Sequence, residues 1–185
     1  SSGAKLGDDI IVTKSLGLEG SAILASDFEE FLIGKVSRET IKKAQGFIEK
    51  ISVIDEGIIA AKIGVSAMHD ITEGGLLGAC FEVAEASHVG MEIYEDSLPI
   101  LPETQNICTA FDIDPLGLIS SGSMLICTPK GNEVTAALKN YNISSTIIGK
   151  VTLQGIYMVT PDGKHPIVPF ERDELVRAIE KVQEL

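Results

Sequence analysis

Short apolar runs alternate with one-sided apolar stripes along the chain. The runs are typical of strands and cover residues 10–13, 65–68, 90–94, 123–127, 145–151 and 156–160. The stripes have the spacing of amphipathic helices and cover residues 18–33, 41–48, 53–62, 75–87, 102–111, 134–141 and 175–182. Strands separated by helices, together with one late pair of consecutive strands, predict an α+β fold with α/β/α layers, in which helices flank a mixed sheet.

Local signals mark where several of these helices begin. Ser37 and Asn132 each precede a stripe and are suited to cap a helix N-terminus. Pro102 is expected at a first helical position, where its missing N–H costs nothing. Asp70 and Glu73 are three residues apart and match a capping box at the start of the helix over residues 75–87.

Composition indicates a single compact domain. The 185 residues are 44% apolar and 23% charged, a balance that excludes an intrinsically disordered chain. No apolar stretch is long enough for a membrane span, and no signal peptide opens the sequence. We therefore expect a cytoplasmic protein. The chain begins with Ser1 and not with Met, and we expect it to be a processed or excised piece of a longer one.

The cysteines and histidines form no recognisable ligand set. Cys80, Cys108 and Cys127 are too widely spaced for a disulfide framework or a metal-binding knuckle. Cys80 and Cys127 fall on apolar faces and are predicted to be inert core thiols, whereas Cys108 is expected to be partly exposed. The three histidines lack the spacing of zinc ligands, so the sequence predicts no metal site of this kind.

Charge is concentrated in the middle of the chain. The net charge is −12, which argues against nucleic acid or anionic lipid as the main partner. Residues 51–116 contain one basic residue, Lys62, and twelve acidic ones, a net charge of −11. This segment is either a solvated acidic face or a surface that meets a basic partner or a ligand carrying Mg²⁺.

The most unusual stretch is His69-Asp70-Ile71-Thr72-Glu73-Gly74-Gly75. A capping box explains Asp70 and Glu73, but it does not explain two glycines in a first helical turn, each costing about 1 kcal/mol against alanine in a helix interior. A strand, a glycine-bearing turn and a helix N-terminus together favour anion binding, because free N–H groups and the helix dipole point at the ligand. An ordinary strand-to-helix turn is the alternative.

Two further turns have similar chemistry. Ser120-Ser121-Gly122 offers two hydroxyl groups and a flexible backbone to a phosphate or carbonyl oxygen. Gly17-Leu18-Glu19-Gly20 leads from a strand into a helix and is a third possible anion site. For both, a plain turn between regular elements is the alternative interpretation.

Several segments are recognisable as a set. In order, they are Lys5-Leu6-Gly7-Asp8-Asp9-Ile10-Ile11, residues 69–76, the helix containing Glu82, Gly90-Met91-Glu92-Ile93, Leu98-Pro99-Ile100, Asp114-Pro115-Leu116 and Ser121-Gly122-Ser123-Met124-Leu125. Together they resemble the C-terminal domain of the aminoimidazole ribonucleotide (AIR) synthase-related superfamily, with spacing most similar to hydrogenase expression/formation proteins of the HypE type. The resemblance implies one such domain over residues 1–185, without the family's N-terminal nucleotide-binding domain.

The resemblance implies the C-terminal half of an ATP-dependent enzyme that activates an amide or carbonyl oxygen or phosphorylates a small acceptor. ATP and Mg²⁺ would be held mainly by the absent N-terminal domain, so we expect the isolated domain to be inactive. The full-length protein is expected to be a homodimer with a maturation-factor protein as a partner. The expected phosphate- or ligand-binding residues are His69, Asp70, Thr72, Glu73, Gly74, Gly75, Ser121 and Gly122.

Two questions stay open at this point. HypE-type proteins carry their substrate on a C-terminal cysteine, whereas this chain ends in Glu184-Leu185, so a related ATP-dependent step on another substrate is equally compatible. The alternative to an enzyme is a non-catalytic module that binds a partner protein through the acidic segment 51–116.

Overall fold

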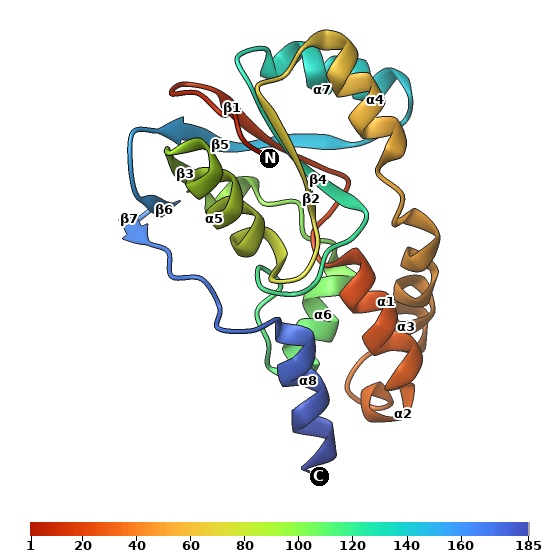
Figure 1. Cartoon of the computed structure of the whole chain (residues 1–185). Coiled ribbons are helices and arrows are strands. Elements are labelled where there is room, and N and C mark those ends of the chain that lie inside the picture. The colour runs from red at the N-terminus through yellow and green to blue at the C-terminus, as the bar shows by residue number, and fades with distance from the viewer. Residues whose placement is uncertain (185) are drawn as a thin grey trace.

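A computed structural model describes residues 1–184 and shows one seven-stranded sheet with helices against it (Figure 1). The strands are β1 (Asp9–Thr13), β2 (Ala67–Ile71), β3 (Gly90–Tyr94), β4 (Ser123–Thr128), β5 (Ser145–Thr152), β6 (Ile156–Thr160) and β7 (Gly163–Pro166). Their order in the sheet is β2-β4-β1-β5-β3-β6-β7. Among the strand pairs of the described residues, β3–β6 alone is parallel, so the sheet is mixed, which confirms the predicted fold class.

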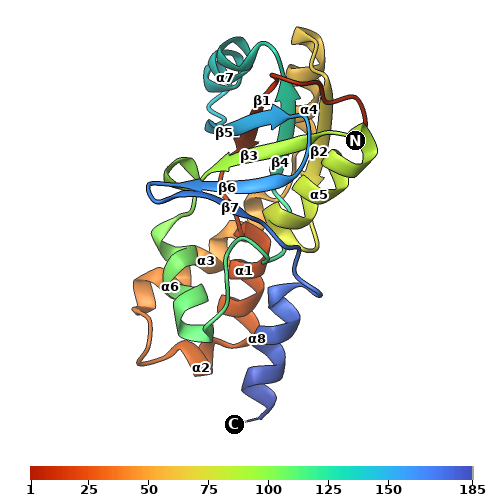
Figure 2. The same ribbon diagram turned by 90° about the vertical axis from the view of Figure 1, so that its left-hand side faces the viewer.

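The helices form three groups. Their bounds are α1 (Leu18–Asp27), α2 (Glu29–Leu32), α3 (Arg38–Gln45), η1 (Gly46–Lys50), α4 (Ile54–Ile63), α5 (Gly75–Ser87), η2 (Glu95–Ser97), α6 (Pro102–Phe111), α7 (Gly131–Asn140) and α8 (Glu174–Gln183). α5 covers one face of the sheet, and α4 with α7 covers the other. α1, α2, α3, α6 and α8 form a separate helical layer below the sheet in Figures 1 and 2.

Each group has its own apolar core. Ile10 and Val12 point from β1 toward α5, and Ile11 points to the opposite face toward α7, because successive residues of a strand alternate between faces. β4 is buried along its whole length, since helices cover both sides of it. The third core lies in the helical layer, around Leu24, Phe111 and other residues of α1, α3 and α6.

Two predicted helices differ from the structure. The stripe over residues 18–33 is two helices, since the chain breaks at Phe28 (φ −124°) and turns its ring onto Phe111, with ring centroids 6.2 Å apart. The expected cap at Asn132 was wrong: α7 begins at Gly131 after Lys130. Gly131 packs directly on the Asp9 side chain, where any added Cβ would overlap the carboxyl group.

Other signals are confirmed. The Ser37 hydroxyl accepts a hydrogen bond from the Thr40 N–H at 3.1 Å, and Pro102 is the first residue of α6.

Strand β7 was not expected, because Gly163-Lys164-His165-Pro166 has no apolar pattern. It is held by pairing with β6. Of the helices within residues 1–184, none combines the length and apolarity needed to cross a bilayer.

Candidate functional site

The stretch 69–75 begins inside the sheet. β2 continues to Ile71 and pairs with β4, so His69 and Asp70 lie opposite Leu125 and Met124, and the prediction that the strand ends at residue 68 was wrong. Asp70 therefore cannot form the expected capping box with Glu73. The residue that precedes α5 is Gly74, in the left-handed conformation (φ 79°) and with no cap from a neighbouring side chain.

Gly75 is required by a close backbone approach. It has a φ of 61°, and a Cβ added there would lie 2.5 Å from the carbonyl oxygen of Leu116 and 2.8 Å from that of Leu118. The Leu77 N–H also donates to the Leu116 oxygen at 3.2 Å. At Gly74 the nearest atom to an added Cβ is 3.5 Å away, so Gly74 is required only for its positive φ. The paired glycines thus bring the start of α5 against the segment 116–118.

Ser120 joins all three candidate turns. Its N–H donates to the Thr72 carbonyl at 3.4 Å, and its hydroxyl accepts from the Gly17 N–H at 2.8 Å. The Gly20 N–H donates to the Ile119 carbonyl at 3.1 Å. Three elements therefore meet at one place: the end of β2, the start of β4 and the start of α1. From the sequence they were three independent candidate sites.

The predicted residues divide into exposed and enclosed groups at this junction. The side chains of Asp70, Thr72 and Glu73 are exposed, and Ser121 is half-buried. Gly122 is buried, and an added Cβ would lie 2.8 Å from the Lys50 carbonyl oxygen. The exposed side chains are the groups that a ligand can reach.

His69 faces α5. Its Nε2 hydrogen-bonds the carboxylate of Glu82, and its Nδ1 lies 3.2 Å from the Ser1 hydroxyl and 3.7 Å from Asp70 Oδ1. His69 thus links β2 to α5 and lies beside the carboxylate of Asp70.

Asp173 is a site residue that the sequence analysis missed. Its side chain is buried and accepts hydrogen bonds from the N–H groups of Gly74 at 2.7 Å, Ile119 at 3.2 Å and Leu175 at 2.8 Å. The bond to Leu175 is an N-cap of α8, and an aspartate just before the last apolar stripe was a readable sign of it. The bonds to Gly74 and Ile119 span 99 and 54 residues, and no local pattern indicates them.

The two glycine N–H groups at the start of α5 are not free to bind an anion. The Gly74 N–H is used by Asp173, and the Gly75 N–H donates to the Thr72 carbonyl at 3.1 Å. The two glycine amides are therefore already satisfied within the protein. A ligand at the junction would meet the carboxylates of Asp70 and Glu73 and the hydroxyls of Thr72 and Ser121.

This donor set fits Mg²⁺ carried by a nucleotide. Magnesium takes oxygen ligands and is usually held by one or two carboxylates together with substrate phosphates. Within residues 1–184 no three His, Cys, Asp or Glu side chains cluster as a closed metal site. One carboxylate oxygen of Glu19, in the first turn of α1, is buried without a hydrogen-bond partner, which also suits a cation.

The segment next to Gly122 is held by a buried ion pair. Lys14 Nζ lies 2.7 Å from Glu56 Oε1, with the two side chains 19% and 4% exposed. The same ammonium group donates to the carbonyls of Lys50 at 2.9 Å and Ser52 at 2.6 Å. Lys14 thereby fixes the link between η1 and α4, one wall of the junction.

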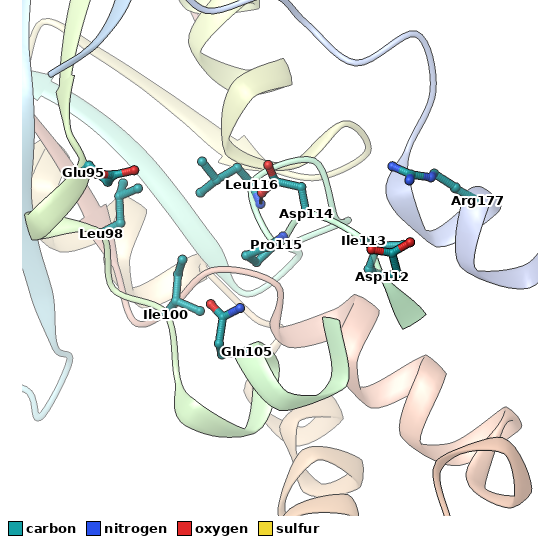
Figure 3. Close-up of a pocket in the computed structure, with 10 residues that line it drawn as sticks. All are labelled: Glu95, Leu98, Ile100, Gln105, Asp112, Ile113, Asp114, Pro115, Leu116 and Arg177. Carbon is teal, nitrogen blue, oxygen red and sulfur yellow. Dashed lines mark hydrogen bonds between the residues drawn. The ribbon is translucent and has the colours of Figure 1, made fainter. Parts of the chain in front are cut away.

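A separate cleft of about 570 Å³ lies on the other side of the segment 112–116 (Figure 3). Figure 3 shows Arg177 of α8 and Asp112 at one end of it, Glu95 and Leu98 at the other end, and Gln105 of α6 below. Leu116 separates this cleft from the start of α5, since its carbonyl contacts Leu77.

None of the three thiols is poised for chemistry. All are buried, so the expectation that Cys108 is partly exposed was wrong. Burial raises the pKa of Cys108 and of Cys127 to about 12, and it also raises the pKa of Cys80. A thiol that stays protonated near neutral pH is a poor nucleophile.

Comparison with known proteins decides the family. The family model for the AIR synthase related protein, C-terminal domain, matches residues 5–160. The chain belongs to this family. It is 37% identical over 128 residues to a hydrogenase expression/formation protein of Methanocaldococcus jannaschii, covering 67% of the chain and 35% of that protein. It is 32% identical over 132 residues to the carbamoyl dehydratase HypE of Rhodobacter capsulatus, covering 71% of the chain and 36% of that protein.

Solved structures share the AIR synthase-related fold. Escherichia coli HypE superposes with a TM-score of 0.78 at 24% identity, over 94% of this chain and 53% of that one. HypE in complex with ATP superposes with a TM-score of 0.68 at 21% identity, over 95% of this chain and 53% of that one. A HypE–HypF complex superposes with a TM-score of 0.70 at 22% identity, over 91% of this chain and 55% of the matched chain. The chain thus spans about half the length of these structures and aligns with about a third of the two relatives.

Proposed function

We propose that this chain is the C-terminal half of an ATP-dependent enzyme related to the HypE-type hydrogenase-maturation proteins. The enzyme would activate an amide or carbonyl oxygen, or phosphorylate a small acceptor. A nucleotide-binding half like that of the longer relatives would hold most of the ATP, so this half alone would be inactive. A cytoplasmic homodimer is the proposed state of the full-length protein.

One observation carries this proposal: three turns from distant parts of the sequence meet around Ser120 and leave Asp70, Thr72 and Glu73 exposed beside Ser121. The family membership and an ATP-bound protein of the same fold make a nucleotide the best-supported ligand for this junction. No such argument favours the cleft in Figure 3.

The exposed side chains have distinct roles in this proposal. Asp70 and Glu73 would hold Mg²⁺, which neutralises phosphate charge during phosphoryl transfer. The hydroxyls of Thr72 and Ser121 would donate hydrogen bonds to phosphate oxygens. Gly75 and Gly122 would act indirectly, because their close packing places these side chains, and Gly74 would act through its positive φ. Groups fixed before the reaction stabilise developing charge without reorganising, which is the main source of catalytic electrostatics.

The test is ATP turnover by this chain joined to a nucleotide-binding half. We expect Asp70→Ala to lower turnover at least tenfold, because the Mg²⁺ contact is lost while the exposed side chain leaves the fold intact. Asp162→Ala, which removes an aspartate that is also exposed, in the β6–β7 turn, is the matched control and should leave turnover unchanged. Wild-type turnover in Asp70→Ala would contradict the assigned role.

A second candidate is a module that binds a partner protein through the acidic segment 51–116, and a HypE–HypF complex among the proteins of this fold favours it. The fold compensates part of this charge with lysines from outside the segment, in the pairs Glu56–Lys14, Glu92–Lys164, Glu103–Lys43 and Asp112–Lys181. Binding through the remaining carboxylates should weaken steeply between low and physiological ionic strength. Salt-independent binding would exclude this surface.

A further inference from the structure

Asp173 is a buried carboxylate whose partners are all backbone amides. Only 4% of the residue is exposed, and its two oxygens accept three hydrogen bonds, from Gly74, Ile119 and Leu175. Among residues 1–184, no lysine, arginine or histidine forms an ion pair with it. Its charge is therefore balanced by N–H dipoles, and hydrogen bonds of this kind are about twice as strong as neutral ones.

Two of these bonds cross-link the site. Gly74 follows Thr72 and Glu73, and Ile119 precedes Ser120 and Ser121. One carboxylate thus holds the two segments that supply the exposed side chains. Their direct hydrogen bond, from the Ser120 N–H to the Thr72 carbonyl, is 3.4 Å long and weaker than the 2.7 Å bond from Gly74 to Asp173.

A capping role for α8 explains only the third bond. An N-cap side chain has to reach the N–H of N2 or N3 of its own helix, and the bond to Leu175 does that. The bonds to Gly74 and Ile119 add nothing to the cap. Asp173 also cannot contact a ligand itself, because it is enclosed and both of its oxygens are used.

We propose that Asp173 is a positioning residue for the ligand site. Its carboxylate sets the distance between the segments 72–75 and 119–121, and it couples the docking of α8 to the arrangement of Thr72, Glu73 and Ser121. The ligand part of this inference rests on the proposed function, whereas the cross-link itself does not.

The neighbouring residue provides a matched control. Glu174 is equally buried, at 3% exposed, and also anchors α8: its carboxylate accepts from the Asp114 N–H at 2.8 Å, and its N–H donates to the Gly117 carbonyl at 3.1 Å. Neither contact reaches Gly74. A defect caused by loosening α8 would therefore follow either substitution, whereas a defect at the site would follow only the loss of Asp173.

The test compares Asp173→Ser, Asp173→Asn and Glu174→Gln in the full chain. Serine keeps a good N-cap but is too short to reach Gly74, and asparagine keeps the shape while placing an amide against N–H donors. NMR would follow amide exchange at Gly74, Ile119 and Leu175, and titration with Mg²⁺ and the non-hydrolysable ATP analogue AMPPNP would give affinity.

In Asp173→Ser we expect exchange at Gly74 and Ile119 to accelerate at least tenfold, with Leu175 within threefold of wild type. The affinity for Mg²⁺·AMPPNP should fall at least fivefold in both Asp173 variants and less than twofold in Glu174→Gln. Unchanged or tighter binding in the Asp173 variants, or equal losses in Glu174→Gln, would overturn the inference. If the wild-type chain binds no Mg²⁺·AMPPNP, the proposed function fails, and amide exchange at Gly74 alone decides the cross-link.

Discussion

Gly75 and Leu116 are in direct backbone contact, with no space for a side chain between the first residue of α5 and the Leu116 carbonyl. This contact places a helix start and a loop, 41 positions apart in the sequence, in a fixed relation beside the exposed Thr72 and Glu73. Of the glycine pair that first suggested an anion site, Gly75 thus acts through packing and Gly74 through its positive φ.

Gly75→Ala should destabilise the protein by about 2–5 kcal/mol. The added methyl group would overlap the carbonyls of Leu116 and Leu118, overpacking costs about 1–3 kcal/mol, and a left-handed conformation costs a further 1–2 kcal/mol for alanine. Gly74 has a similar φ, but an added Cβ there makes only ordinary van der Waals contact, with the nearest atom 3.5 Å away, so Gly74→Ala should cost only about 1–2 kcal/mol. Urea unfolding measures both, and equal losses would show that conformation rather than contact governs Gly75.

Lys14→Met should destabilise the protein by about 3 kcal/mol, because it leaves the buried Glu56 carboxylate without its partner. Replacing both residues, as in Lys14→Met with Glu56→Leu, should restore most of the loss, since no unpaired charge remains. The four unfolding free energies of this double-mutant cycle give the coupling. A double variant as unstable as the sum of the two single variants would show that the pair does not act as a unit.

Stability should fall as pH rises above about 9. Burial holds the pKa of Cys108 and Cys127 at about 12 in the folded chain, whereas a thiol in the unfolded chain ionises near pH 8.5. Between these values the unfolded state binds fewer protons, so each thiol lowers the unfolding free energy by up to about 1.4 kcal/mol per pH unit.

Urea unfolding at pH 8 and pH 10.5 measures this slope, and Cys108→Ala is the control. The variant should lose the contribution of one thiol and leave the effects of tyrosine and lysine ionisation in place. An identical slope in wild type and Cys108→Ala would show that Cys108 ionises in the folded protein.

Sequence reasoning succeeded where the cause is local. Ser37 caps α3 and Pro102 starts α6 because the partners of each lie within four residues. The predictions from sequence failed where pairing with a distant segment overrides a local signal. Asp70 reads as a cap, but pairing with Met124 of β4 draws it into the sheet.

Long-range contacts also explain what the sequence could not show about the site. Ser120 was one of several hydroxyls in a plausible turn, and its contacts with Gly17 and Thr72 exist only in the fold. Asp173 was visible only as a potential cap, because its bonds to Gly74 and Ile119 span 99 and 54 residues. The three candidate turns were found, whereas their convergence required the structure.

The most direct test of the account is an NMR titration of this chain with Mg²⁺·AMPPNP, with the backbone amides assigned. Saturable shifts are expected at residues 70–73 and 121–122, and they should be lost in Asp70→Ala. Affinity should be weak, because in the proposed function a separate nucleotide-binding half holds most of the ATP. Shifts confined to the cleft lined by Glu95, Asp112 and Arg177, or the absence of any saturable shift, would contradict the proposal that this junction faces the nucleotide.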